Sequence, residues 1–463
     1  MGSKWETVKL GDLTKWSSGG TPNKSEDSYW NGTIPWISAS SMEGHLYSDS
    51  KLKITEDGLI NGSRLAPANS ILLLVRGSIL HQKIQVGLAT KAVAFNQDVK
   101  CLIVNNDMID PWYLLLWFKA KEQDLLKIVE STGIGAGKLD TKLLMDYPVE
   151  IPPKEIKEYI RFLGKAIFDK ITLNENINYN LEKMSQTLFK SWFVDFDPVI
   201  DNALDAGNPI PEALQTRAKL RQKVRNSADF KPLPTEIRSL FPSEFEETEL
   251  GWVPKGWKID NIGGLSDKIF SGGTPNTSTE EYWNGALNWF SSGETRNALI
   301  IETEKKITAT GVKNSSTRLS VAGDILIASA GQGHTRGQTS LNTIDTYINQ
   351  SVVCIRPIKP SYSTWLYFNL SSRYTEMRAI SDSHSIRGSL TTKLISSMKV
   401  ASPTDELISL FDINCSVFIS KIKNNLELSR ELKKLRDTLL PKLISGELSL
   451  EDLPDLNTDT EAA

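Results

Sequence analysis

Two glycine-rich segments carry side chains that could hydrogen-bond to the edges of nucleobases. The first contains Arg76, Gly77, Ser78, His81, Gln82, Lys83 and Gln85, and the second contains Gly331, Gln332, Gly333, His334, Thr335, Arg336, Gly337 and Gln338. Arginine and lysine pair readily with guanine, and asparagine and glutamine pair with adenine. An ordinary polar surface loop is the competing interpretation of both segments.

Further polar residues could contact phosphates, which accept hydrogen bonds from cations and backbone amides. The candidate cations are Lys24, Lys138, Arg296 and Arg387. The same dipeptide occurs twice, as Asn96-Gln97 and Asn349-Gln350. Residues that select different bases should differ from each other, so we expect these identical pairs to have a structural or phosphate-binding role.

No motif predicts catalysis by this chain. The segment Gly133–Leu139 resembles a phosphate-binding loop, but Thr132 and Leu139 occupy positions that need Gly and Ser or Thr. The four histidines include no pair at helical ligand spacing, so we expect no metal site. The three cysteines have neither zinc-ligand spacing nor an even count, which fits a reducing cytoplasm.

The strongest signal in the sequence is an internal repeat with a period near 250 residues. Ser18–Asn23 recurs as Ser271–Asn276, and Tyr29–Gly32 recurs as Tyr282–Gly285, both at an offset of 253. The offset is 254 at Arg64-Leu65 and Arg318-Leu319, and 251 where the repeat ends. A preserved order of motifs with small drifts in offset indicates gene duplication.

Each copy combines a strand-rich part with a helix. Short apolar runs punctuated by Gly, Asn and Ser predict strands at Ile71–Val75, Val99–Val104, Ile325–Ala328 and Val352–Ile355. The repeated Trp30, Trp36, Trp283 and Trp289 are expected in the core. The prolines Pro152, Pro153 and Pro403 introduce the helices.

A spacing of three and four residues predicts a coiled-coil seam in each helix. The first seam runs from Ile160 to Leu188 and the second from Phe411 to Leu439, and each is interrupted by the same residue types: Lys170 and Asn174, then Lys421 and Asn425. These positions could be solvated. Alternatively, antiparallel packing would bring Asn174 to Asn425 and fix the alignment. The first seam would span about 42 Å at 1.5 Å per residue, close to one turn of B-DNA at about 34–36 Å.

The charge balance limits how this chain could bind a polyanion alone. Its 463 residues carry 53 Lys and Arg against 56 Asp and Glu, a net charge of −3. Residues 256–402 contain 15 basic and 11 acidic residues, or +4, whereas residues 1–153 contain 16 and 17, or −1. If DNA is the ligand, we expect partner subunits to provide much of the phosphate contact.

The chain resembles the specificity subunits of type I restriction–modification systems. The resemblance rests on Leu188–Val199 at the end of the first helix, Leu250–Trp257 before the second copy, Leu439–Leu448, and the two Ser-Gly-Gly-Thr-Pro blocks. It implies an α+β fold with two tandem target recognition domains of pseudo-twofold symmetry, separated by two long antiparallel coiled-coil spacer helices. The expected boundaries are recognition domains at 1–152 and 256–402, helices at 153–194 and 403–446, an ordered connector at 195–255 and a tail at 447–463.

The resemblance also implies a function. Each recognition domain would read one half of a bipartite, asymmetric DNA target, and the helices would set the gap between the halves. Two methylation subunits using S-adenosylmethionine and two motor-nuclease subunits using ATP and Mg²⁺ would join the chain, which itself would bind no cofactor. The alternative is a duplicated, non-catalytic scaffold that binds protein or glycan, which the near-neutral charge favours.

Overall fold

The computed structural model describes residues 5–42, 44–105, 107–132, 135–331, 334–384 and 389–448. Its contacts divide the chain into unit 1, formed by Met1–Leu173 and Ser429–Ala463, and unit 2, formed by Asn174–Leu428. The expected boundaries give each long helix a segment of its own, whereas each unit contains one half of each helix.

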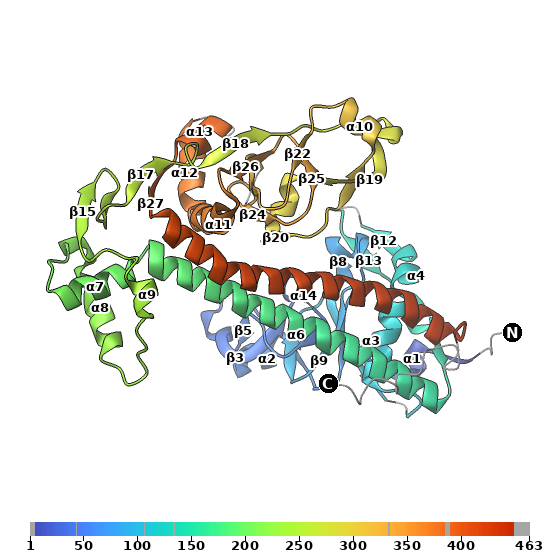
Figure 1. Cartoon of the computed structure of the whole chain (residues 1–463). Coiled ribbons are helices and arrows are strands. Elements are labelled where there is room, and N and C mark those ends of the chain that lie inside the picture. Colours follow the sequence, from blue (N-terminus) through green and yellow to red (C-terminus); the bar gives the residue numbers. More distant parts are fainter. Residues whose placement is uncertain are drawn as a thin grey trace, which may run out of the picture. The chain divides into compact units, whose positions relative to one another are not determined.

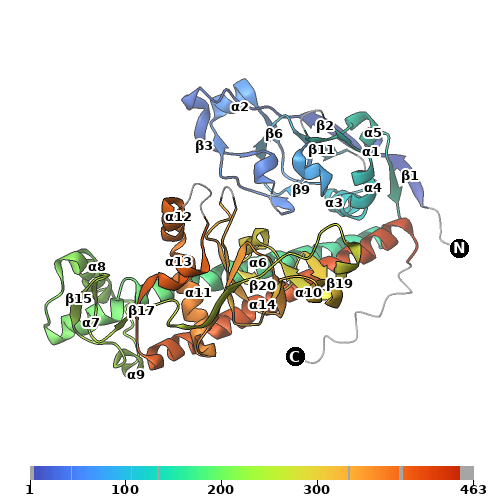
Figure 2. The same ribbon diagram turned by 90° about the horizontal axis from the view of Figure 1, so that it is seen from above.

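Unit 1 is built on two main sheets accompanied by short helices (Figures 1 and 2). The five-stranded sheet has the order β2 (Thr14–Ser18), β11 (Val99–Val104), β7 (Ile71–Leu74), β9 (Val86–Ala89) and β4 (Leu46–Tyr47). The four-stranded sheet has the order β5 (Lys53–Ile54), β3 (Trp30–Ile37), β10 (Val93–Phe95) and β6 (Arg64–Ala66). Smaller sheets pair β1 (Glu6–Lys9) with β14 (Pro148–Ile151), and β13 (Gly137–Leu139) with both β12 (Val129–Ser131) and β8 (Arg76–Gly77). The helices are α1 (Leu10–Leu13), α2 (Glu56–Gly62), α3 (Pro111–Ala120), α4 (Glu122–Lys127) and α5 (Thr141–Met145).

Unit 2 repeats this topology. Its five-stranded sheet has the order β18 (Ser266–Ser271), β26 (Val352–Pro357), β23 (Ile325–Ala328), β24 (Thr339–Asn342) and β20 (Leu299–Ile300). Its four-stranded sheet has the order β21 (Lys305–Ile307), β19 (Trp283–Phe290), β25 (Thr346–Ile348) and β22 (Arg318–Ser320). Two further pairs are β17 (Lys258–Asn261) with β27 (Lys399–Ser402) and β15 (Phe245–Thr248) with β16 (Gly251–Pro254). The helices are α7 (Asp197–Ala206), α8 (Gln215–Arg225), α9 (Thr235–Arg238), α10 (Ala309–Lys313), α11 (Ser363–Ser372), α12 (Tyr374–His384) and α13 (Thr392–Ser397). The matching strand orders confirm the predicted duplication.

The repeated Gly-Gly-Thr-Pro block forms the same turn in both units. A Cβ on Gly19 would lie 2.0 Å from the carbonyl oxygen of Phe95, and one on Gly272 would lie 1.9 Å from that of Ile348. Only glycine allows such close backbone approach. The glycines of this block therefore have a structural role in both units. The expectation of a core position also holds for Trp36 and Trp289, which are each 5% exposed, while the repeated Trp30 and Trp283 are partly exposed.

The two long helices are α6 (Lys154–Phe193) and α14 (Asp405–Ser445), close to their expected bounds. In unit 2 they are antiparallel, because Asn174 contacts Asn425 and the ring of Phe189 lies 5.8 Å from that of Phe411. In unit 1 the guanidinium of Arg436 lies 5.3 Å from the ring centroid of Phe168. The two units thus each contain one half of α6 against one half of α14 (Figure 1).

The predicted contact between the seam asparagines is confirmed, but the predicted lysines are not part of the seam. The Asn174 side-chain amide donates to the Asn425 carbonyl oxygen at 3.4 Å, and the Asn425 amide donates to Asn178 Oδ1 at 2.8 Å. Lys170 and Lys421 are exposed. Their neighbours Ile171 and Ile422 are buried instead, at 4% and 7% exposed. On a helix of 3.6 residues per turn, a strict alternation of three and four residues cannot decide which of two adjacent residues faces the partner helix. The apolar residue of each adjacent pair is the buried one.

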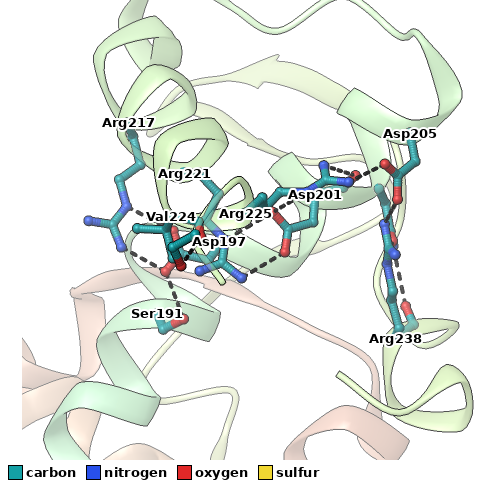
Figure 3. Close-up of polar contacts among 11 residues, drawn as sticks. Ser191, Asp197, Asp201, Asp205, Arg217, Arg221, Val224, Arg225 and Arg238 are labelled. Atoms are coloured by element: carbon teal, nitrogen blue, oxygen red, sulfur yellow. Dashed lines mark hydrogen bonds and ion pairs between the residues drawn. The ribbon is translucent and has the colours of Figure 1, made fainter. Parts of the chain in front are cut away.

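An ordered connector follows α6, as expected, and a row of ion pairs holds it together (Figure 3). Three aspartates on α7 meet three arginines on α8, each 20 residues later: Asp197 with Arg217, Asp201 with Arg221, and Asp205 with Arg225. The first two pairs are bidentate. Because the offset is constant, α7 and α8 run in the same direction. The hydroxyl of Ser191 donates to Asp197 Oδ2 at 2.8 Å, which ties the row to the end of α6.

Separate cores lie in the two units. The core of unit 1 lies where α3 covers β7 and β9, and it includes Trp117 together with Ile160 of α6 and Leu440 of α14. The core of unit 2 includes Trp365 of α11, together with Phe189 and Phe411. Within the described residues, no helix combines the length and apolarity needed to span a membrane.

Candidate nucleic-acid interface

The first glycine-rich segment leaves the five-stranded sheet of unit 1 directly after β7. Its apolar side chains Leu80 and Ile84 are 0% and 1% exposed, which anchors the segment to the core. The Ile84 backbone N–H also donates to Glu122 Oε1 at 2.8 Å. The candidate contacts Arg76, Ser78, His81, Gln82 and Lys83 are all exposed. The fold thus presents these five side chains to solvent from a backbone that is fixed on its inner side.

The structure brings a distant candidate, Lys138, to this segment. Strands β13 and β8 are antiparallel and place Lys138 opposite Arg76. The adjacent Gly137 permits this approach, since a Cβ there would lie 2.9 Å from the Cβ of Leu80. Two exposed cations therefore lie on neighbouring strands, an arrangement suited to a phosphate.

Gln85 differs from its neighbours and is not a candidate contact. It is 9% exposed, and its side-chain amide donates to the carbonyl oxygen of Met42. Gln85 lies at the start of the return to β9, where the chain enters the core. The Gln85 side-chain amide therefore satisfies a backbone carbonyl inside unit 1 and is not available to an external ligand.

Lys24 lies in a different part of unit 1, in a hollow of about 740 Å³ next to the four-stranded sheet. Trp30, Trp36 and Gln97 also line this hollow. The hydroxyl of Thr21 donates to Gln97 Oε1 at 2.7 Å, and Thr274 makes the same bond to Gln350 in unit 2. The repeated Asn-Gln pairs thus have a shared structural bond, in line with one of the two roles expected for them.

Unit 2 places three candidate contacts around one groove of about 970 Å³. Arg296, His334 and Gln338 line it, together with Gln186 and Lys190 of α6. The Tyr374 hydroxyl donates to the His334 carbonyl oxygen at 2.9 Å and holds the glycine-rich segment at the groove. Thr335 is partly exposed in the same segment.

Arg336 and Arg296 both have ion-pair partners within unit 2. We expected Arg336 to face a base, but its side chain is 9% exposed and pairs with Asp382 of α12. It therefore fastens α12 to the glycine-rich segment. Arg296 is exposed and pairs with Glu304. The candidates Gln332 and Arg387 lie outside the described residues.

Burial perturbs two ionisable groups near these segments. In unit 1 the ring of His45 lies 3.9 Å from that of Phe168, and burial, with the charges of Lys119 and Arg436, lowers the pKa of His45 to about 4. In unit 2 burial raises the pKa of the Glu182 carboxyl, which lines the groove. Among the described residues, no three His, Cys, Asp or Glu side chains gather as metal ligands.

The family comparison agrees with this duplicated arrangement. The model of the type I restriction modification DNA specificity domain matches residues 2–183 and 254–434. The HindI type I specificity subunit of Haemophilus influenzae is 25% identical over 412 residues, which cover 82% of this chain and 89% of the relative. The MjaIX type I specificity subunit of Methanocaldococcus jannaschii is 24% identical over 459 residues, covering 97% and 94%. A crystal structure of a type I system S subunit from M. genitalium has a TM-score of 0.49 at 14% identity and covers 95% of this chain and 96% of that one.

Proposed function

The chain belongs to the family of type I restriction modification DNA specificity domains, and on this premise we propose that each unit reads one half of a bipartite, asymmetric DNA target. Two matches of one DNA specificity domain in a single chain fit two half-sites. In this proposal the chain is the non-catalytic specificity subunit of the complex. It selects the DNA and leaves methylation and cleavage to other subunits.

The main support for the proposal is that the two units have the same fold but present different side chains to solvent. Both five-stranded sheets have the same strand order, and a glycine-rich segment follows the equivalent strands β7 and β23. The side chains that these segments present differ: unit 1 presents the exposed Arg76, Gln82 and Lys83, while unit 2 presents the exposed His334 and the partly exposed Gln338 at its groove. Two readers of one architecture with different hydrogen-bonding groups would select different base sequences.

The long helices would set the gap between the two half-sites. Their antiparallel packing in unit 2 includes the buried asparagine pair, with Asn174 and Asn425 at 1% and 4% exposed. A buried polar pair of this kind favours one register, because sliding either helix would leave the amides without partners. Insertion of residues into α6 is therefore expected to change the preferred gap and to leave both half-sites unchanged.

Two methylation subunits and two motor-nuclease subunits would complete the assembly. S-adenosylmethionine would bind to the former, and ATP and Mg²⁺ to the latter. We place the complex in the cytoplasm, a proposal supported by the three cysteines, which are buried and free of disulfides.

Methylome sequencing of a host that expresses this chain with its partner subunits tests the proposal. We expect methylation at a single bipartite motif with a fixed gap. Methylation of a continuous motif would contradict the proposal. Duplex binding without any sequence preference would favour the alternative, a scaffold protein.

A further inference from the structure

A basic hollow of about 390 Å³ lies in unit 2, and none of its lining residues lines the groove around His334. It is lined by Lys268, Arg318 and Arg356, together with Phe270 and two apolar neighbours. Strands β18 and β26 place Lys268 opposite Arg356, and β22 of the other main sheet provides Arg318. The hollow therefore joins three cations from two sheets around one aromatic ring.

The aromatic ring holds two guanidinium groups at similar distances. The guanidinium carbons of Arg318 and Arg356 lie 6.0 Å and 5.8 Å from the ring centroid of Phe270. Each cation is attracted by the ring, but the two positive charges repel each other. An anion bound in the hollow would offset this repulsion.

The charges of the hollow are only partly compensated within the described residues. Arg356 forms a bidentate pair with the buried Asp324, at 3.0 Å and 2.8 Å, and this pair raises the pKa of the guanidinium. Asp267 also lies near Arg356. Lys268 and Arg318 are exposed, and neither forms an ion pair with any residue that the structure describes. Two cations thus face solvent beside a third whose position is fixed.

Unit 1 has a reduced version of the same arrangement. Lys15 corresponds to Lys268 and Arg64 to Arg318, both at equivalent places in the sheets. The positions of Arg356 and Phe270 are occupied by Ile103 and Ser17. The two shared cations are thus kept in both copies, and unit 2 adds a third cation and the ring. This addition contributes to the charge difference of +4 against −1 between the copies.

We propose that this hollow in unit 2 binds phosphates of the DNA backbone. The inference rests on the proposed function and adds a contact that is independent of sequence. Guanidinium and ammonium groups are the usual phosphate partners. Arg356 pairs with Asp324 near the start of β23, whereas the glycine-rich segment follows its end, so the hollow and the base-reading candidates lie at opposite ends of one strand. Contact here extends the footprint of unit 2 without choosing bases.

The test measures DNA affinity against salt concentration for the complex of this chain with its methylation subunits, using the motif found by methylome sequencing. The double variant Lys268→Gln and Arg318→Gln is compared with wild type. Affinity decreases with salt, and each phosphate contact contributes about 0.9 to the magnitude of the slope of log affinity against log salt. For the double variant we therefore expect a slope that is less steep by about 1.8. The methylated motif should not change.

A matched double variant controls for the loss of two charges. Lys313 of α10 and Lys393 of α13 are exposed and likewise form no ion pair among the described residues. Changing both to Gln should leave the slope at its wild-type value. An unchanged slope for the Lys268 and Arg318 variant would overturn the inference, as would a loss of subunit assembly with the slope preserved, which would indicate a protein contact. Failure of the wild-type complex to prefer any motif would instead refute the proposed function.

Discussion

In the connector, α7 packs against α8 mainly through ion pairs and not through apolar contacts. Breaking one of these ion pairs tests this description. Asp201 and Arg221 form a bidentate pair at 2.9 Å and 2.7 Å, and their side chains are 10% and 19% exposed (Figure 3). On α8 only Ala218 is buried, so little apolar contact competes with the ion pairs. The change Asp201→Ala leaves the Arg221 guanidinium without its carboxylate in a largely buried place.

The expected cost of this change follows from the cost of an unpaired buried charge. Removing one partner of such a pair costs about 3 kcal/mol. Arg221→Ala should cost less than Asp201→Ala, because Asp201 keeps a second partner, Arg225, at 3.9 Å. The double variant should cost no more than Asp201→Ala alone, because the Arg221 charge is then no longer left unpaired. The costs of the two single variants are therefore expected not to add.

Native-state hydrogen exchange measures this locally, without requiring the whole chain to unfold in one step. The amides of α7 and α8 should exchange about a hundredfold faster in Asp201→Ala, since about 1.4 kcal/mol corresponds to a factor of ten. Glu244→Ala is the control, because it breaks an exposed pair with Lys255 and should leave exchange in these helices unchanged. Single-variant costs that simply add in the double variant would refute the role given to the ion-pair row.

Two further predictions concern stability. The folded-state pKa of His45, about 4, lies below its ordinary value of 6.5, so between these pH values the unfolded chain binds more protons than the folded chain. The stability of the chain should therefore fall as the pH drops from 6.5 to 4. In thermal melting experiments the His45→Phe variant should lack this part of the pH-dependent loss of stability. Gly272→Ala should lower the melting temperature of the chain, since its Cβ would meet backbone at 1.9 Å, while Gly264→Ala, whose nearest contact would be 3.5 Å, should melt like wild type. Equal melting of the two glycine variants would contradict the close packing described for the repeated turn.

The sequence predicted the duplicated architecture because its signals are local. Glycines of the repeated block sit where backbones touch, and apolar runs such as Ile325–Ala328 became central strands. The asparagine contact between α6 and α14 was also predictable, because antiparallel helices of equal seam length bring their midpoints together. These predictions needed only spacing and chain order.

Other features depend on three-dimensional neighbours that spacing does not reveal. Arg336 was a candidate base contact, but Asp382, 46 residues later, pairs with it. The three-and-four spacing assigned Lys170 to the seam, although the apolar character of its neighbour Ile171 indicated the residue that is buried. The basic hollow was missed because Lys268 and Arg318 come from separate strands. A signal existed, since both cations recur in the other copy as Lys15 and Arg64.

If the two units read DNA independently, exchanging one reading segment should alter one half-site only. Residues 331–338 of unit 2 would be replaced by the corresponding segment of another specificity subunit with a known target, and the methylome of the host would be sequenced. We predict that one half of the methylated motif changes, while the other half and the gap stay the same. A change in both halves, or an unchanged motif in an active complex, would contradict the account.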